Sequence, residues 1–110
     1  IKASSGSLTV YVEIIQFSCP SEFLTQMELE GIKVISAELV EGARPLSSYT
    51  FDFSRPVCLV VGNEQVGVPT EILMQSEVLY IPMPGVGYCL NTAQAANILL
   101  YEAVKQFKNM

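Results

Sequence analysis

Apolar residues follow two patterns that alternate along the chain. Short runs rich in β-branched and aromatic residues predict strands over 10–17, 33–39, 57–61 and 78–83. Stretches in which apolar residues recur three and four positions apart predict helices over 21–30, 70–75 and 91–108. Because strands alternate with helices, we expect an α/β fold with a mostly parallel sheet and helices on both faces.

Residues that start and stop helices flank each helical stretch. Ser21 is a candidate N-cap of the first helix, and Gly31 is expected to end it. Pro69 fits the first turn of the second helix. Asn91 or Thr92 offers a side-chain oxygen for the N-cap of the third.

The spacing also predicts which residues are buried. The first helix is expected to share one apolar face among Phe23, Leu24, Met27 and Leu29. The last helix is expected to bury Ala96, Leu99, Leu100, Ala103, Val104 and Phe107. The continuous apolar run over 57–61 is typical of a strand covered on both faces. Ser76, just after the second helix, is expected to face solvent. The glycine, proline and serine residues over 40–55 indicate a surface loop.

The composition is that of one domain over residues 1–110, or of a piece of one. Half of the residues are apolar and 15% are charged, so the chain can bury a core. The net charge of −5 argues against a chain that binds nucleic acid alone through a basic face. Nucleic acid is still possible as a substrate, because a further segment or a second subunit could carry positive charge.

The three cysteines have no metal-ligand spacing, and histidine is absent. We therefore expect neither a metal site nor a disulfide scaffold, and a reducing, cytoplasmic location. Neither a signal peptide pattern nor an apolar run of about 18 residues is present, so no membrane partner is expected. The chain opens with Ile1 rather than methionine, which suggests that it is cut from something longer.

The first candidate for chemistry is the loop over 62–69, which follows the strand over 57–61. In open α/β sheets ligands bind at the carboxyl ends of strands. Gly62 and Gly67 allow close backbone approach, and Glu64 offers a carboxylate. The loop is neither a P-loop nor a dinucleotide fingerprint, so by itself it is best interpreted as an ordinary strand-to-helix turn.

The second candidate is the glycine- and proline-containing loop over 84–91. Cys89 could act as a nucleophile, but the chain has no histidine to serve as its base, so a small buried thiol is favoured. Asn91 by itself is best interpreted as a plain N-cap.

Taken together, the two loops point to a family. GNEQVG after an apolar strand, followed by IPM, a glycine-containing loop and CLN at the start of an alanine-rich helix, resembles the SpoU (TrmH-like) RNA 2′-O-methyltransferases of the SPOUT superfamily. The opening KASSGSL is similar to the segment just after the family's first motif. The resemblance therefore covers nearly the whole chain.

The resemblance implies a cofactor, S-adenosylmethionine, and an RNA substrate, tRNA or rRNA, whose ribose 2′-hydroxyl is methylated. It also implies a C-terminal trefoil knot and a homodimer formed through helices that include the last one. Cofactor-binding positions would be Gly62, Ile81, Met83, Gly85 and Leu90, several of them through the backbone. Positions at the catalytic end would be Glu64, Cys89 and Asn91.

The chain departs from the family pattern in two places. The first motif, with the arginine usually assigned to activating the ribose hydroxyl, would lie before Ile1, together with the first strands of the sheet. Cys89 stands where the family usually has serine. One alternative is therefore a non-catalytic relative that dimerises or binds RNA or cofactor. Another is a flavodoxin-like nucleotide binder without a knot.

Overall fold

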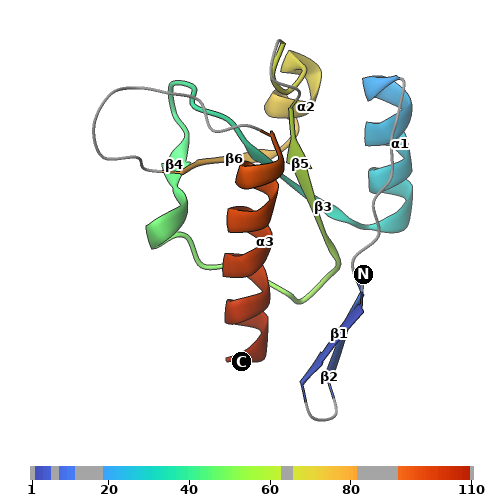
Figure 1. Ribbon diagram of the computed structural model, residues 1–110. Helices are drawn as coiled ribbons and strands as arrows, with labels where there is room; N and C mark the ends of the chain where they lie inside the picture. The colour runs from blue at the N-terminus through green and yellow to red at the C-terminus, as the bar shows by residue number, and fades with distance from the viewer. Residues whose placement is uncertain (1, 6–7, 12–18, 63–65, 82–91, 110) are drawn as a thin grey trace.

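In the part of the chain that the structure describes, a four-stranded parallel sheet carries helices on both faces, and the first two strands form a separate two-stranded sheet (Figure 1). The computed structural model describes residues 2–5, 8–11, 19–62, 66–81 and 92–109. In chain order the elements are β1 (Lys2–Ser5), β2 (Leu8–Tyr11), α1 (Pro20–Glu30), β3 (Lys33–Ala37), β4 (Arg44–Pro45), the 3₁₀ helix η1 (Leu46–Ser48), β5 (Val57–Val61), α2 (Thr70–Met74), β6 (Glu77–Tyr80) and α3 (Thr92–Lys108).

The sheet confirms the predicted α/β arrangement. Its strand order is β4-β6-β3-β5, and each neighbouring pair is parallel. The strands β1 and β2 pair with each other in antiparallel fashion and form their own sheet. Because parallel strands end at the same edge, β3, β5 and β6 deliver the segments that follow them to one side of the molecule.

Two apolar clusters lie on opposite faces of the sheet. On one face, Leu99 and Ala103 of α3 pack with Ile35 of β3. On the other, Phe23 of α1 and Ile72 of α2 pack in a second cluster, and Figure 1 shows these two helices on the side of the sheet away from α3. This arrangement confirms the predicted burial of Leu99 and Ala103 and the predicted helices on both faces.

The strand β5 contributes to both clusters, as its apolar run predicts. Val57, Leu59 and Val61 pack against the α3 side, whereas Cys58 and Val60 pack against the α1 and α2 side. All five side chains are only half-buried. Among the described strands β5 has a neighbour, β3, on one side only, which accounts for the remaining exposure.

Two expectations for α1 are wrong. The N-cap is Cys19 rather than Ser21, because Pro20 already occupies the first turn, where its missing N–H costs nothing. Leu29 is 78% exposed, since it lies two residues beyond the buried Met27 and so about 200° further round the helix. The expected end is confirmed: Gly31 adopts a left-handed conformation with φ 67°.

The segment over 40–55 lies largely at the surface, as its turn residues predict, but part of it belongs to the core. It contains β4 and η1, and Leu46, Tyr49 and Phe51 belong to the core under α3. The ring of Phe53 stacks on Phe51 and meets the edge of Phe107 in α3. Turn residues marked the bends correctly, but the burial depends on a helix about fifty residues away, which local sequence does not reveal.

Ser76 does not face solvent as predicted. It is half-buried and shares a 2.9 Å hydrogen bond with the hydroxyl of Ser36, which is fully buried in β3. A buried hydroxyl needs such a partner, which explains why two serines meet between β3 and β6.

Several predicted boundaries shift by a few residues. The strand expected over 33–39 ends at Ala37, and the strand expected from Val10 begins at Leu8. The strand expected over 78–83 is β6, which begins at Glu77 and ends at Tyr80. Residues 12–17, 82 and 83, also assigned to strands from the sequence, lie outside the described residues.

Candidate functional site

The carboxyl edge of the sheet brings together the segments that follow three strands. Ala37 at the end of β3 is paired with Val61 of β5 and with Leu79 of β6. The next residue of β3, Glu38, therefore lies level with Gly62 on one side and Tyr80 on the other. Gly62 and Ile81, both predicted to bind cofactor, thus flank the end of β3.

Gly62 lies directly against the backbone of the segment that returns toward it. A Cβ atom at Gly62 would overlap the backbone of Gly67 and Val68. Only glycine therefore permits this approach, as the sequence predicted for both glycines of the loop. The return point is fixed by Val68, whose side chain is 4% exposed and packs in the cluster under α1 and α2.

Glu38 is the residue at this edge that the sequence reasoning missed. The N–H of Val68 donates a 3.1 Å hydrogen bond to Oε1 of Glu38. The backbone N–H of Glu38 donates a 2.9 Å bond to the carbonyl of Leu79 in β6. The predicted strand over 33–39 included Glu38, so its place at the ligand-binding edge becomes visible only because β3 ends at Ala37.

The remaining predicted site residues have no structural test. Glu64, Met83, Gly85, Cys89, Leu90 and Asn91 all lie outside the described residues. Of the predicted set, the structure describes Gly62 and Ile81, which lie on either side of the end of β3. Ile81 is half-buried and packs against the cluster under α3, so the exit from β6 is held against the core.

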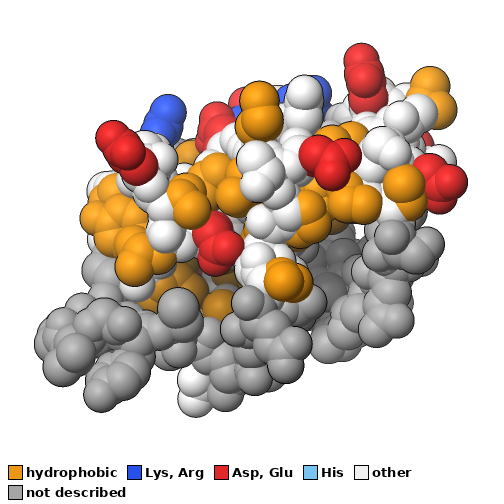
Figure 2. Space-filling model, turned by 90° about the horizontal axis from the view of Figure 1, so that it is seen from above, with side chains coloured by type: hydrophobic (Ala, Val, Ile, Leu, Met, Phe, Trp, Pro, Cys, Tyr) orange, Lys and Arg blue, Asp and Glu red, His pale blue; other side chains and the backbone are white. Residues whose placement is uncertain are grey.

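The charge at this edge favours a cationic ligand. Glu38 places a carboxylate there, and its Oε1 accepts the hydrogen bond from Val68. Figure 2 views the molecule from above, the side toward which β5 points in Figure 1, and shows acidic side chains and some basic ones standing among apolar ones. A ligand with a positive centre gains Coulomb attraction from such a surface.

The opposite end of the sheet carries a polar network of a different kind. The Tyr49 hydroxyl donates to Oε2 of Glu77, and Nζ of Lys33 lies 3.2 Å from Oε1 of the same carboxylate. Burial, and then the bond to Glu77, raises the pKa of Tyr49. The bond from Tyr49, followed by Lys33, lowers the pKa of Glu77. Because Lys33 and Glu77 begin their strands, this network lies far from the carboxyl edge and is structural.

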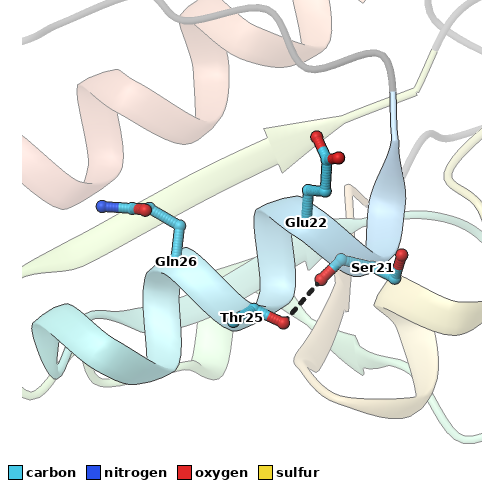
Figure 3. A pocket seen from close by; sticks show the side chains of 4 residues that line it. All are labelled: Ser21, Glu22, Thr25 and Gln26. Atoms are coloured by element: carbon cyan, nitrogen blue, oxygen red, sulfur yellow. Dashed lines mark hydrogen bonds between the residues drawn. The ribbon is translucent and has the colours of Figure 1, made fainter.

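A shallow surface pocket lies on α1, lined by Ser21, Glu22, Thr25 and Gln26 (Figure 3). All four side chains are exposed, and the hydroxyl of Thr25 donates to the Ser21 carbonyl at 2.9 Å. These residues form one face of a single helix, so we assign the pocket no ligand.

The described cysteines and helices add little chemistry. Cys19 and Cys58 are free thiols, and burial raises the pKa of Cys58. Among the residues that the structure describes, no three acidic or thiol side chains form a group able to hold a metal ion. No helix within the same residues has the length and apolar character needed to cross a membrane.

Comparisons with known proteins agree on one family. The model of the SpoU rRNA Methylase family matches residues 1–101. The chain is 41% identical over 110 residues to a 23S rRNA (uridine(2479)-2′-O)-methyltransferase of Streptomyces viridochromogenes, covering 96% of this chain and 38% of that protein. It is 27% identical over 108 residues to the tRNA (guanosine(18)-2′-O)-methyltransferase of Escherichia coli strain K12, covering 97% of this chain and 46% of that protein.

A solved structure shows the same fold. A SpoU methyltransferase from Streptomyces viridochromogenes, in complex with the cofactor AdoMet, matches with a TM-score of 0.70 at 30% identity, covering 84% of this chain and 38% of that chain. The chain spans less than half the length of each of these three proteins.

Proposed function

Because the chain belongs to the SpoU rRNA Methylase family, within the SPOUT superfamily, we propose that it is the cofactor-binding part of an S-adenosylmethionine-dependent RNA ribose 2′-O-methyltransferase. The observation that carries the proposal is the carboxyl edge, where the segment after β5 and the exit from β6 flank the end of β3. The names of the two curated relatives support tRNA or rRNA as the substrate class.

The residues at this edge fit the cofactor. S-adenosylmethionine supplies, when bound, a methyl group activated on a sulfonium centre. Gly62 and Ile81 would hold it largely through their backbone, and the carboxylate of Glu38 suits its positive charge. By family resemblance, Leu90, Met83 and the turn at Gly85 complete the pocket.

Methyl transfer then depends on placement of the ribose hydroxyl and loss of its proton. We assign Glu64 and Asn91 to orienting polar groups at the catalytic end, with Cys89 beside them as a small polarisable group. The group that activates the hydroxyl is proposed to be the arginine of the family's first motif, supplied by sequence before Ile1.

The proposal also includes features of the intact protein. We propose that the C-terminal segment forms a trefoil knot and that further strands lie beside β5. We also propose that the intact protein acts as a homodimer in the cytoplasm. Support for further strands comes from β5, which is apolar and half-buried and has β3 as its only neighbour among the described strands. Support for a dimer comes from α3, where Ile98 and Tyr101 are exposed one turn apart.

The test is titration calorimetry of the chain with S-adenosylhomocysteine, the product of the cofactor, with ATP as the control. We expect micromolar binding of S-adenosylhomocysteine alone. Binding of ATP alone would favour the phosphate-binding, flavodoxin-like alternative. Absence of binding in a chain extended before Ile1 would reject the cofactor assignment.

A second candidate function is a non-catalytic module that binds cofactor or RNA without methyl transfer. The net charge of −5 favours a module that binds cofactor alone, because binding the phosphates of RNA normally requires clustered basic residues. Transfer of a labelled methyl group from S-adenosylmethionine to tRNA or rRNA transcripts by the full-length protein separates the two. Incorporation supports the enzyme, whereas binding without incorporation supports the module.

A further inference from the structure

Glu38 is bonded to both segments that form the proposed cofactor edge. Its backbone N–H donates to the carbonyl of Leu79, two residues before Ile81, at 2.9 Å. Its side-chain Oε1 accepts the N–H of Val68, at the end of the loop that starts at Gly62, at 3.1 Å. One residue of β3 therefore connects the exit from β6 to the loop after β5.

The carboxylate also fills space beside that loop. Gly67 has φ 70°, and a Cβ atom on it would collide with Oε1 of Glu38. The loop backbone is thus packed onto the carboxylate on one side, while the buried side chain of Val68 anchors it in the core on the other. Removal of Glu38 would release the first of these two anchors.

We infer that Glu38 is a positioning residue, which holds the loop after β5 and the exit from β6 in the arrangement that binds the cofactor. This inference rests on the proposed function. The bond depends on an acceptor oxygen at this reach, which a carboxylate and a side-chain amide both supply. Binding a ligand through main chain at two loops requires those loops to be fixed relative to each other, which this bond achieves.

The test compares four variants by calorimetric titration with S-adenosylhomocysteine. Glu38→Ala removes the acceptor, and Glu38→Asp keeps the charge but shortens the side chain by one methylene. Glu38→Gln keeps an acceptor oxygen at the same reach. Glu41→Ala is the matched control, because it removes the same charge from the same connection at an exposed position.

We expect Glu38→Ala and Glu38→Asp to weaken binding by about tenfold or more, the usual effect of losing a hydrogen bond to a charged group. Glu38→Gln and Glu41→Ala should stay within about threefold of the unaltered chain, since the first keeps the bond and the second changes only exposed charge. Equal affinity of Glu38→Asp and the unaltered chain would overturn the inference. If Glu38→Ala does not fold, Glu38→Asp and Glu38→Gln still decide it.

Amide hydrogen exchange separates this inference from the proposed function. The Val68 amide should exchange faster in Glu38→Asp than in Glu38→Gln, whether or not a ligand is present. An unaltered chain that binds no S-adenosylhomocysteine, but shows this difference, would overturn the cofactor role and leave the loop anchor intact. Unchanged Val68 exchange in Glu38→Asp would overturn the anchor itself.

Discussion

At the scale of single residues, the Tyr49–Glu77 hydrogen bond should make stability depend on pH at both ends of the range. The pKa of Glu77 is lowered, so its contribution is present above the ordinary glutamate pKa and is lost as pH falls through the native value. The pKa of Tyr49 is raised, so its contribution is present below the ordinary tyrosine pKa and is lost as pH rises above it.

Tyr49→Phe should therefore lower the free energy of unfolding at neutral pH by about 1–2 kcal/mol, partly offset because solvent screens Glu77. The loss of stability on the acid side should shrink, and the tyrosine-linked loss on the alkaline side should disappear. Urea unfolding over a series of pH values checks both slopes. Parallel curves for the variant and the unaltered chain would contradict the assignment.

Gly62→Ala tests the backbone approach in the loop. The added methyl group would overlap the backbone of Gly67 and Val68, so we expect a loss of about 1–3 kcal/mol in stability and loss of S-adenosylhomocysteine binding. Gly31→Ala is the control, since a methyl group added there meets no neighbouring atom within 4 Å and only its left-handed backbone, with φ 67°, opposes it. It should cost stability through strain alone and leave the affinity unchanged. Full affinity in Gly62→Ala would count against the site.

At the scale of elements, the side-chain amide of Gln106 ties α3 to the segment over 49–51. Its Oε1 accepts the N–H of Phe51 at 2.8 Å, and its Nε2 donates to the carbonyl of Tyr49 at 2.9 Å. The same Nε2 donates to Glu102 one turn earlier in the helix at 2.7 Å. The amide thus replaces the pairing that a neighbouring strand would give this irregular segment.

Gln106→Met keeps the length of the side chain but leaves those two backbone groups without their partner. We expect a cost of about 2 kcal/mol or more, since part-buried backbone groups lose hydrogen bonds. Lys105→Met removes only the exposed ion pair with Glu102 and should cost less than about 0.5 kcal/mol. Chemical unfolding of the two variants side by side compares their free energies of unfolding. Equal losses would argue against the role of Gln106 in tying α3 to the segment over 49–51.

The elements also show how far the sequence alone could go. The strand β5 was predicted correctly from its apolar run, and the helix α3 from the spacing of its apolar residues, because each element packs regularly spaced side chains against the core. The core residues over 46–51 escaped detection since their burial comes from contacts with a distant helix. For the same reason Glu38 was missed, as its partner Val68 is thirty residues away in the chain.

At the scale of the whole molecule, the exposed side of α3 is the surface on which the proposed homodimer depends. Tyr101 is 69% exposed and Ile98 is 39% exposed, and residues three apart lie on one side of a helix. Burying two such side chains in each subunit would supply the apolar centre that a stable interface needs.

Tyr101→Glu should convert a dimer to a monomer at micromolar concentration, because it places a charge at that centre. Leu29→Glu is the control on α1, where the side chain is equally open to solvent, and should leave the oligomeric state unchanged. Sedimentation equilibrium measures both variants against the unaltered chain. A dimer that survives Tyr101→Glu would place the interface elsewhere.

The two glycines of the loop after β5 should have different evolutionary histories. The space beside Gly62 is filled by main-chain atoms, which stay in place whatever side chains the neighbouring residues carry. A second substitution therefore cannot make room for a larger residue at position 62. The space beside Gly67 is filled by the side chain of Glu38. A shorter residue at position 38 would leave that space open. In an alignment of descendants, position 62 should remain glycine, whereas positions 38 and 67 should covary, with asparagine the commonest newcomer at 67 because it tolerates a positive φ.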